Sequence, residues 1–176
     1  MVTNTDHRMV FLDIYVGAPG QVHDARVFHN SDVFQRINDE NHRLLDGEHH
    51  IIGDTAYPLL RNLMTPFRDN GHLTREEINY NMKLSSVRSV IERAYGRLKG
   101  KFRRLKYLDV ASAEFGTQII AAACVLHNYI LINNDEEEAE EFEGNYDENV
   151  GAEDFDDDNP NVAVQKRRNI VNILNN

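Results

Sequence analysis

The pattern of hydrophobic and polar positions predicts short strands early in the chain. Residues 9–16 are mostly apolar and β-branched and end at a Gly-Ala-Pro-Gly turn, which predicts a strand that runs into a loop. Residues 49–52 form a second short apolar run, so we expect a strand that ends just before Asp54. Between them, Ser31 is suited to cap a short helix that reaches Ile37.

Two longer helices are predicted in the middle of the chain. Within residues 85–106, apolar side chains recur at steps of three and four, as in an amphipathic helix. On a helical projection Glu92 lies roughly 120° from the centre of this apolar stripe. The same face carries three cations: Arg88, Lys99 and Arg103. Residues 113–132 predict a second helix, which we expect to be buried because residues 119–126 are apolar nearly all round.

The remaining segments complete a three-part organisation. Thr74 and Glu77 fit a capping box for one or two helical turns. Residues 133–161 are acidic and poor in apolar side chains, so we expect disorder there. Residues 162–176 regain apolar positions and predict a short terminal helix that docks on the body, which we assign to residues 1–132.

Charge is distributed unevenly along the 176 residues, of which 41% are hydrophobic and 27% charged. The net charge of −10 comes from residues 135–158, which hold 14 Asp and Glu and no Lys or Arg. By contrast, residues 83–106 hold nine Lys or Arg and one acid. This basic block supplies the local charge that nucleic-acid binding requires, although the chain as a whole is acidic.

Composition also excludes several classes of protein. The longest apolar run has eight residues, whereas a membrane span needs about 20. Because the start of the chain lacks a secretory signal as well, we expect a soluble intracellular protein with no membrane partner. Cys124 is the only cysteine, which excludes a disulfide framework and a cysteine zinc site within one chain. His127 lacks a metal-ligand spacing, so we interpret it as a hydrogen-bonded core residue.

Three carboxylates are candidates for chemistry. Asp24 follows the first predicted strand, Asp54 ends the second, and Glu92 lies on a helix expected to pack on the sheet. Strand ends converge at one edge of an α/β sheet, so these side chains could meet there. Carboxylates without histidine or cysteine suit Mg²⁺ or Mn²⁺. Such ions activate attacking and leaving oxygens in phosphodiester chemistry.

Each of these residues also has a purely structural interpretation. Asp54 after a glycine is typical of a turn. Asp24 could pair with Arg26 or His23, and Glu92 could be an i to i+4 partner of Arg88. Taken one at a time, the structural interpretation is favoured for each residue, and the residues alone indicate no more than a candidate acidic site beside a basic helix.

Five separate blocks of sequence carry a family resemblance. They are GAPGQVHDARVF (17–28), IGDTAYP (52–58), TPF (65–67) with Asn81, VIERAYGRLK (90–99) and CVLHN (124–128). In this order they resemble the PIF/Harbinger DDE transposases and the domesticated nucleases derived from them. The resemblance covers roughly residues 9–131.

The resemblance implies an RNase H-like fold and a metal-dependent nuclease. By motif, Asp54 and Glu92 match catalytic metal ligands, and Asp24 matches a further ligand. Two divalent ions, Mg²⁺ or Mn²⁺, would orient water or a 3′-hydroxyl for in-line attack on a DNA phosphodiester. Four cations would hold the phosphate backbone: Arg88, Arg93, Lys99 and Arg103.

Family resemblance also implies partners and a location. The partners are DNA and a Myb/SANT-like protein that supplies DNA specificity and nuclear entry. We therefore expect the nucleus, with the cytoplasm as a second location. The run Lys166-Arg167-Arg168 is by itself a weak import signal.

One departure from the family leaves two functions open. Family members carry their first catalytic aspartate in an Asp-Gly-Thr-type motif on an earlier strand, and no such motif occurs here. We therefore expect an incomplete core, the C-terminal part of the domain, with impaired DNA cleavage. The alternative is a catalytically inactive, domesticated scaffold that binds DNA or protein. In a third interpretation, the acidic segment covers the basic helix as an autoinhibitor.

Overall fold

The computed structural model describes residues 2–17, 22–39, 44–133 and 160–176. The chain divides into two compact units. Unit 1 comprises Met1–Val22 and Ser89–Glu148, and unit 2 comprises His23–Arg88 and Asn149–Asn176.

Unit 1 begins with an antiparallel hairpin. Strand β1 (Val2–Thr5) pairs with β2 (Phe11–Tyr15), so the predicted strand is confirmed, but its partner β1 was missed. The connecting turn is held by Asp6, whose Oδ1 accepts the backbone N–H groups of Arg8 and Val10 at 2.9 and 3.0 Å. Because β1 reads Val-Thr-Asn-Thr, it carries no apolar alternation that would have predicted it.

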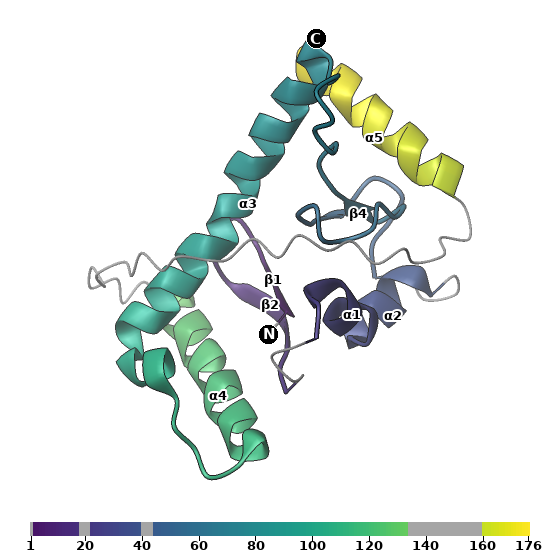
Figure 1. Cartoon of the computed structure of the whole chain (residues 1–176). Helices are drawn as coiled ribbons and strands as arrows, with labels where there is room; N and C mark the ends of the chain where they lie inside the picture. The colour runs from purple at the N-terminus through teal and green to yellow at the C-terminus, as the bar shows by residue number, and fades with distance from the viewer. Residues whose placement is uncertain (1, 18–21, 40–43, 134–159) are drawn as a thin grey trace. The chain divides into compact units, whose positions relative to one another are not determined.

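Helix α4 (Ala113–Ile132; Figure 1) packs against β2 within unit 1 and has the predicted bounds. Ser112 caps it by accepting the N–H of Phe115 at 3.2 Å. The unit 1 core comprises Phe11, Ala94, Leu98, Ala123 and Cys124. The expectation that α4 is buried all round is wrong. Its opposite face is exposed, because β2 and α3 cover one side of the helix.

Helix α3 (Arg75–Lys101) is a single helix of 27 residues that contributes to both units. The predicted capping box is confirmed: the Thr74 N–H donates to Glu77 at 2.9 Å, and the Glu77 N–H donates to the Thr74 hydroxyl at 3.2 Å. The expected length of one or two turns is wrong, because no Pro or Gly interrupts the sequence until Gly96. The helix also stops before residue 106, and a 3₁₀ helix, η1 (Arg103–Tyr107), follows.

Unit 2 contains two short helices, α1 (Asp24–His29) and α2 (Asp32–Asn38). Ser31 caps α2 as predicted by accepting the Phe34 N–H at 3.3 Å. Two short strands, β3 (Ile51–Ile52) and β4 (Leu63–Met64), pair in parallel. The pattern predicted β3 but not β4, which has only two residues.

The terminal helix α5 (Pro160–Asn175) docks within unit 2, as predicted, and its C-terminal end meets the start of α3 (Figure 1). Val171 of α5 packs with Met64, Tyr80 and Leu84. Lys83 of α3 donates to the carbonyl of Leu174 at 2.7 Å. The helix begins at Pro160, inside the segment expected to be disordered; the rest of that segment, residues 134–159, lies outside the described residues.

The fold class is mixed α/β, as expected. Among the described residues, strands pair only as β1 with β2 and as β3 with β4. An RNase H-like core that lacks its first strand therefore stays a prediction.

Candidate functional site

Asp54 lies directly after β3, where the sequence predicted it. The N–H of Gly53 donates to the carbonyl of Met64 at 2.9 Å and so extends the β3–β4 pairing by one bond. Asp54 then closes a turn, since its Oδ1 accepts the Ala56 N–H at 2.8 Å. The structural interpretation of Asp54 as a turn residue is thus confirmed. The turn uses only one of the two carboxylate oxygens, so it is compatible with a second role.

Gly53 fixes the backbone at the start of this turn. A Cβ atom at this position would lie 3.1 Å from Tyr57 Cδ2 and 3.2 Å from Leu63 Cδ1. Contacts this short require the side chains of Tyr57 and Leu63 to move by a few tenths of an ångström, so the packing beside Asp54 is sensitive to a side chain at residue 53.

Asp24 is the first residue of α1 and follows His23, the N-cap residue. The side chain of Asp24 lies outside the described part of the chain, so its suggested pairing with Arg26 or His23 stays a prediction.

Glu92 lies on α3, in the part of the helix that belongs to unit 1, and is partly buried. The candidate DNA-binding residue Arg93 is exposed, whereas Arg88 and Lys99 are partly buried. Arg103 is exposed but lies on η1, beyond the end of α3. The helical projection that placed Arg103 on the face of Glu92 is therefore wrong, because the helix does not continue that far.

The structure places Asp24 and Asp54 in unit 2 and Glu92 in unit 1. Among the described residues, no group of three or more His, Cys, Asp or Glu side chains is arranged to hold a metal ion. A cation shared by these carboxylates is therefore a proposal. The donor set fits Mg²⁺ or Mn²⁺ chemically, because it offers only carboxylate oxygen.

Two helical asparagines have structural roles that the sequence analysis missed. Asn128 of α4 accepts the N–H of Phe11 and donates to its carbonyl, both at 2.8 Å. Asn81 of α3 makes the same pair of bonds to Phe67, both at 2.9 Å. Each side-chain amide thus makes, to one residue, the two backbone hydrogen bonds that a neighbouring strand would make. Both residues belong to the family blocks, which was the available signal.

His127 is fully buried beside Phe11, with ring centroids 5.1 Å apart. Its Nε2 donates to the carbonyl of Met9 at 3.1 Å, so the neutral ring carries its hydrogen there. Nδ1 has no hydrogen-bond partner among the described residues. Burial lowers the pKa of His127, and the nearby cations Lys101 and Arg97 add to this shift. The predicted core role is confirmed, with one nitrogen satisfied.

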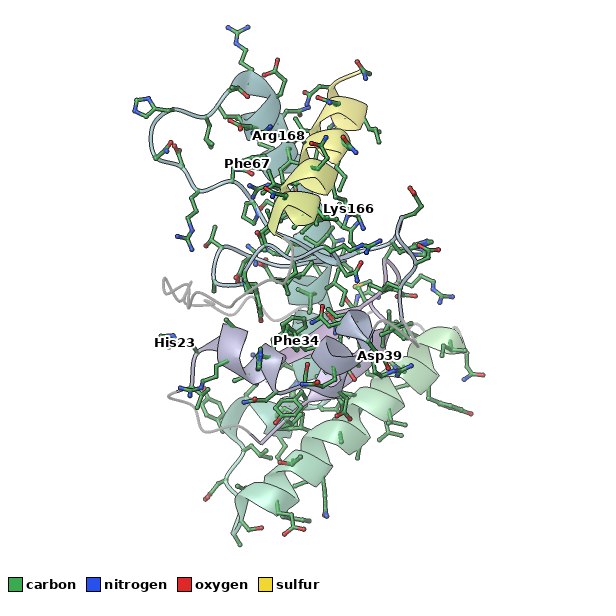
Figure 2. The ribbon with its side chains drawn as sticks, turned by 90° about the vertical axis from the view of Figure 1, so that its right-hand side faces the viewer. His23, Phe34, Asp39, Phe67, Lys166 and Arg168 are labelled. Atoms are coloured by element: carbon green, nitrogen blue, oxygen red, sulfur yellow. The ribbon has the colours of Figure 1, made fainter. Side chains whose placement is uncertain are left out.

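Two residues of the basic run Lys166-Arg167-Arg168 on α5 contact other parts of unit 2. Figure 2 shows Lys166 and Arg168 on α5 and Phe67 on the segment beside it. The Arg167 guanidinium lies 3.8 Å from the centroid of the Phe67 ring, and Lys166 donates to the carbonyl of His49 at 2.9 Å. Burial lowers the pKa of Arg167. Two of the three cations of the suggested import signal thus stabilise α5.

Among the described helices, α4 is long and apolar enough to cross a membrane by length and composition alone. The count of consecutive apolar residues did not reveal this, because His127 and Asn128 interrupt the run. Core helices of soluble proteins pass the same test. In unit 1, α4 buries Ala123, Cys124 and His127 against its neighbours.

Comparisons with known proteins agree with the order of the sequence blocks. A family model described as DDE superfamily endonuclease matches residues 1–128. The chain is 32% identical over 138 residues to the Arabidopsis thaliana protein named Antagonist of Like Heterochromatin Protein 1, covering 72% of this chain and 34% of that protein.

Two animal relatives are similar to the same extent. The chain is 33% identical over 131 residues to the Bos taurus protein named "Putative nuclease HARBI1", and 32% identical over 131 residues to its Homo sapiens namesake. These alignments cover 72% of this chain and 35% of each relative, so the chain spans about a third of the length of the relatives. No solved structure matches. By the family model and these relatives, the chain belongs to the DDE superfamily endonucleases, in the Harbinger-derived group that its motifs resemble.

Proposed function

We propose that this chain carries part of the catalytic apparatus of a divalent-metal-dependent DNA nuclease. The observation that carries the proposal is the DDE endonuclease family match over residues 1–128. The block that contains Asp54 lies at the end of β3, and the block that contains Glu92 lies on α3. Both elements are regular backbone, which is the support that a precisely positioned ligand needs.

In this proposal Asp24, Asp54 and Glu92 bind Mg²⁺ or Mn²⁺, and Asp54 and Glu92 are catalytic. The oxygen of Asp54 that the turn does not use is its metal ligand. The ion, when bound, supplies activation of the attacking oxygen and charge stabilisation at the phosphate. The carboxylates of the chain hold the ion in place.

The cations of α3 and η1 bind the DNA backbone in the same proposal. Arg93 and Arg103 are exposed and can reach phosphates, and Arg88 and Lys99 add positive charge on α3. Binding by such residues depends on charge rather than on base sequence, so it weakens steeply with salt. A Myb/SANT-like companion that confers sequence choice and nuclear entry belongs to the proposal as well.

The proposal is tested by the nicking of supercoiled DNA in Mg²⁺ or Mn²⁺. The substitution Asp54→Asn keeps the oxygen that accepts the Ala56 N–H and removes one ligand charge. We expect it to lower the nicking rate by on the order of 100-fold or more, and Glu92→Gln to do the same.

Matched control substitutions distinguish the loss of a metal ligand from a general effect on folding. Asp69 closes an equivalent turn in unit 2, since its Oδ1 accepts the Gly71 N–H at 2.8 Å, so Asp69→Asn repeats the first change away from the proposed ligands. Glu76→Gln repeats the second change in the first turn of α3. Both controls should nick like the wild type. If the wild type nicks DNA no faster than Asp54→Asn and Glu92→Gln, the nuclease proposal fails for this chain.

A second candidate is a catalytically inactive scaffold that binds DNA or protein. One observation favours it: a relative is named Antagonist of Like Heterochromatin Protein 1. For such a scaffold, Asp54→Asn leaves the affinity for DNA unchanged, whereas Arg93→Gln and Lys99→Gln lower it. Each lost phosphate contact should reduce the slope of log affinity against log salt by about one. Arg75→Gln is the control on the same helix.

A further inference from the structure

Helix α4 has two apolar faces, and among the described residues of unit 1 only one of them is packed. The first face contributes Gly116, Ala123, Cys124 and His127 to the buried interior. The opposite face exposes large apolar side chains, including Val125 at 65% and Tyr129 at 63%. An exposed patch of this kind on a helix marks an interaction surface.

The exposed positions follow the spacing of a coiled-coil seam. In a coiled coil, two apolar residues occur in every seven, at alternating steps of three and four residues. This spacing places their side chains along one line of the helix. On α4 the exposed residues at this spacing are Phe115, Gln118, Ala122, Val125, Tyr129 and Ile132. We call this set the α4 seam. Leu126 lies beside it and is also exposed.

The α4 seam is complementary to itself when two copies run antiparallel. Its six positions are symmetric about the midpoint between residues 123 and 124. Phe115 then faces Ile132 of the second copy, and the small Ala122 faces the branched Val125. Gln118 faces Tyr129, so that an amide and a phenol share one layer. Each layer thus combines two different side chains that fill the space between the helices.

Charge and area favour a second copy of the same chain. The sequence from residue 115 to residue 132 contains no Asp, Glu, Lys or Arg, so the pairing of like helices meets no repulsion. The large apolar side chains of the face expose on the order of 100 Å² each. Two paired copies would bury on the order of 1,000 Å² in total, near the lower bound of a specific interface.

We propose that this chain forms a homodimer through antiparallel pairing of the α4 seam. The interface is distinct from the residues proposed for metal and DNA. It is an isologous contact about a twofold axis, so it closes at two copies. Because its area is modest, the dimer should dissociate on dilution.

Sedimentation equilibrium of the full chain tests the proposal. The wild type should approach twice the monomer mass at about 100 μM and fall toward the monomer below about 1 μM. The substitution Val125→Glu places a charge in the seam and should weaken association by about 100-fold or more, with helical content unchanged. Val87→Glu on α3 is the matched control, because Val87 is also exposed, at 56%, and is not a residue of the seam. A monomeric wild type, or equal association of the two variants, would overturn the proposal.

Cross-linking tests the orientation. In an antiparallel pair, Phe115→Cys should form a disulfide with Ile132→Cys when the two variants are mixed and oxidised, and neither should cross-link with itself. Residues 115 of the two copies would be about 25 Å apart. Self-cross-linking of Phe115→Cys would establish parallel pairing and contradict the proposal. Binding of the wild-type chain to neutral phosphatidylcholine vesicles without self-association would assign the face to lipid instead.

Discussion

At the scale of single residues, three side chains of α3 and α4 replace missing backbone partners. Asn128 and His127 hold residues 9–11 against α4, and Asn81 holds Phe67 against α3. The sequence indicated a core role for His127, because it interrupts an apolar helix. It did not indicate the asparagine contacts, because these depend on which distant backbone groups lack a strand beside them.

Removal of the Asn128 amide should destabilise unit 1. Asn128→Ala leaves the N–H and the carbonyl of Phe11 without their partner, in a partly buried position, and should lower the free energy of unfolding by about 1–3 kcal/mol. Urea denaturation measures this change. The control is Asn133→Ala, which removes an exposed amide bonded to the carbonyl of Tyr129 at the end of α4 and should cost less. Equal effects of the two substitutions would contradict the role of Asn128.

His127 should make stability depend on pH. Its pKa is lowered in the folded chain, mainly by burial, whereas the unfolded chain has a value of about 6.5. Between these two values the unfolded state binds more protons, so stability is complete above about pH 6.5 and is lost as the pH falls. Urea midpoints from pH 8 to pH 5 should show this loss in the wild type and less of it in His127→Gln. His50, whose pKa burial also lowers, adds to the dependence that remains.

At the scale of elements, local sequence signals predicted where helices begin better than how long they are. Ser31 and the Thr74–Glu77 box were predicted to mark helix starts, and each of these cap bonds is present. The start of α4 was predicted as well, but its cap by Ser112 was not. The joining of two predicted helices into α3 was missed, because the sequence around residues 78–84 was interpreted separately from the stripe that follows it. Strands β1 and β4 were missed because they are polar or very short, and their pairing depends on distant segments.

The β3–β4 element should be sensitive to volume at residue 53. Gly53→Ala introduces a Cβ atom close to Tyr57 and Leu63 and should destabilise the chain by about 1–3 kcal/mol. Gly47→Ala is the matched control, because the nearest atom to its Cβ is 3.9 Å away, at the end of the Arg61 side chain. Thermal unfolding distinguishes the two. A Gly53→Ala midpoint equal to that of Gly47→Ala would show that this packing is not required.

At the scale of the whole molecule, the order of five sequence blocks predicted the family, and the family comparison confirmed it. The position of Asp54 at a strand end and of Glu92 on a helix was also predicted correctly. Local pattern does not bring these two residues together, because 37 residues separate them and they belong to different units. The central claim of the nuclease proposal is therefore that Asp54 and Glu92 bind the same cation.

Localised cleavage by iron tests this claim most directly. Fe²⁺ replaces Mg²⁺ at oxygen sites, and with ascorbate and peroxide it cuts the backbone next to the bound ion. We expect the wild-type chain to be cut near residues 54 and 92, with both cuts suppressed by excess Mg²⁺. Asp54→Asn or Glu92→Gln alone should remove both cuts, whereas Asp69→Asn should remove neither. Cuts confined to one of the two positions, or the persistence of one cut after loss of the other carboxylate, would contradict a shared cation.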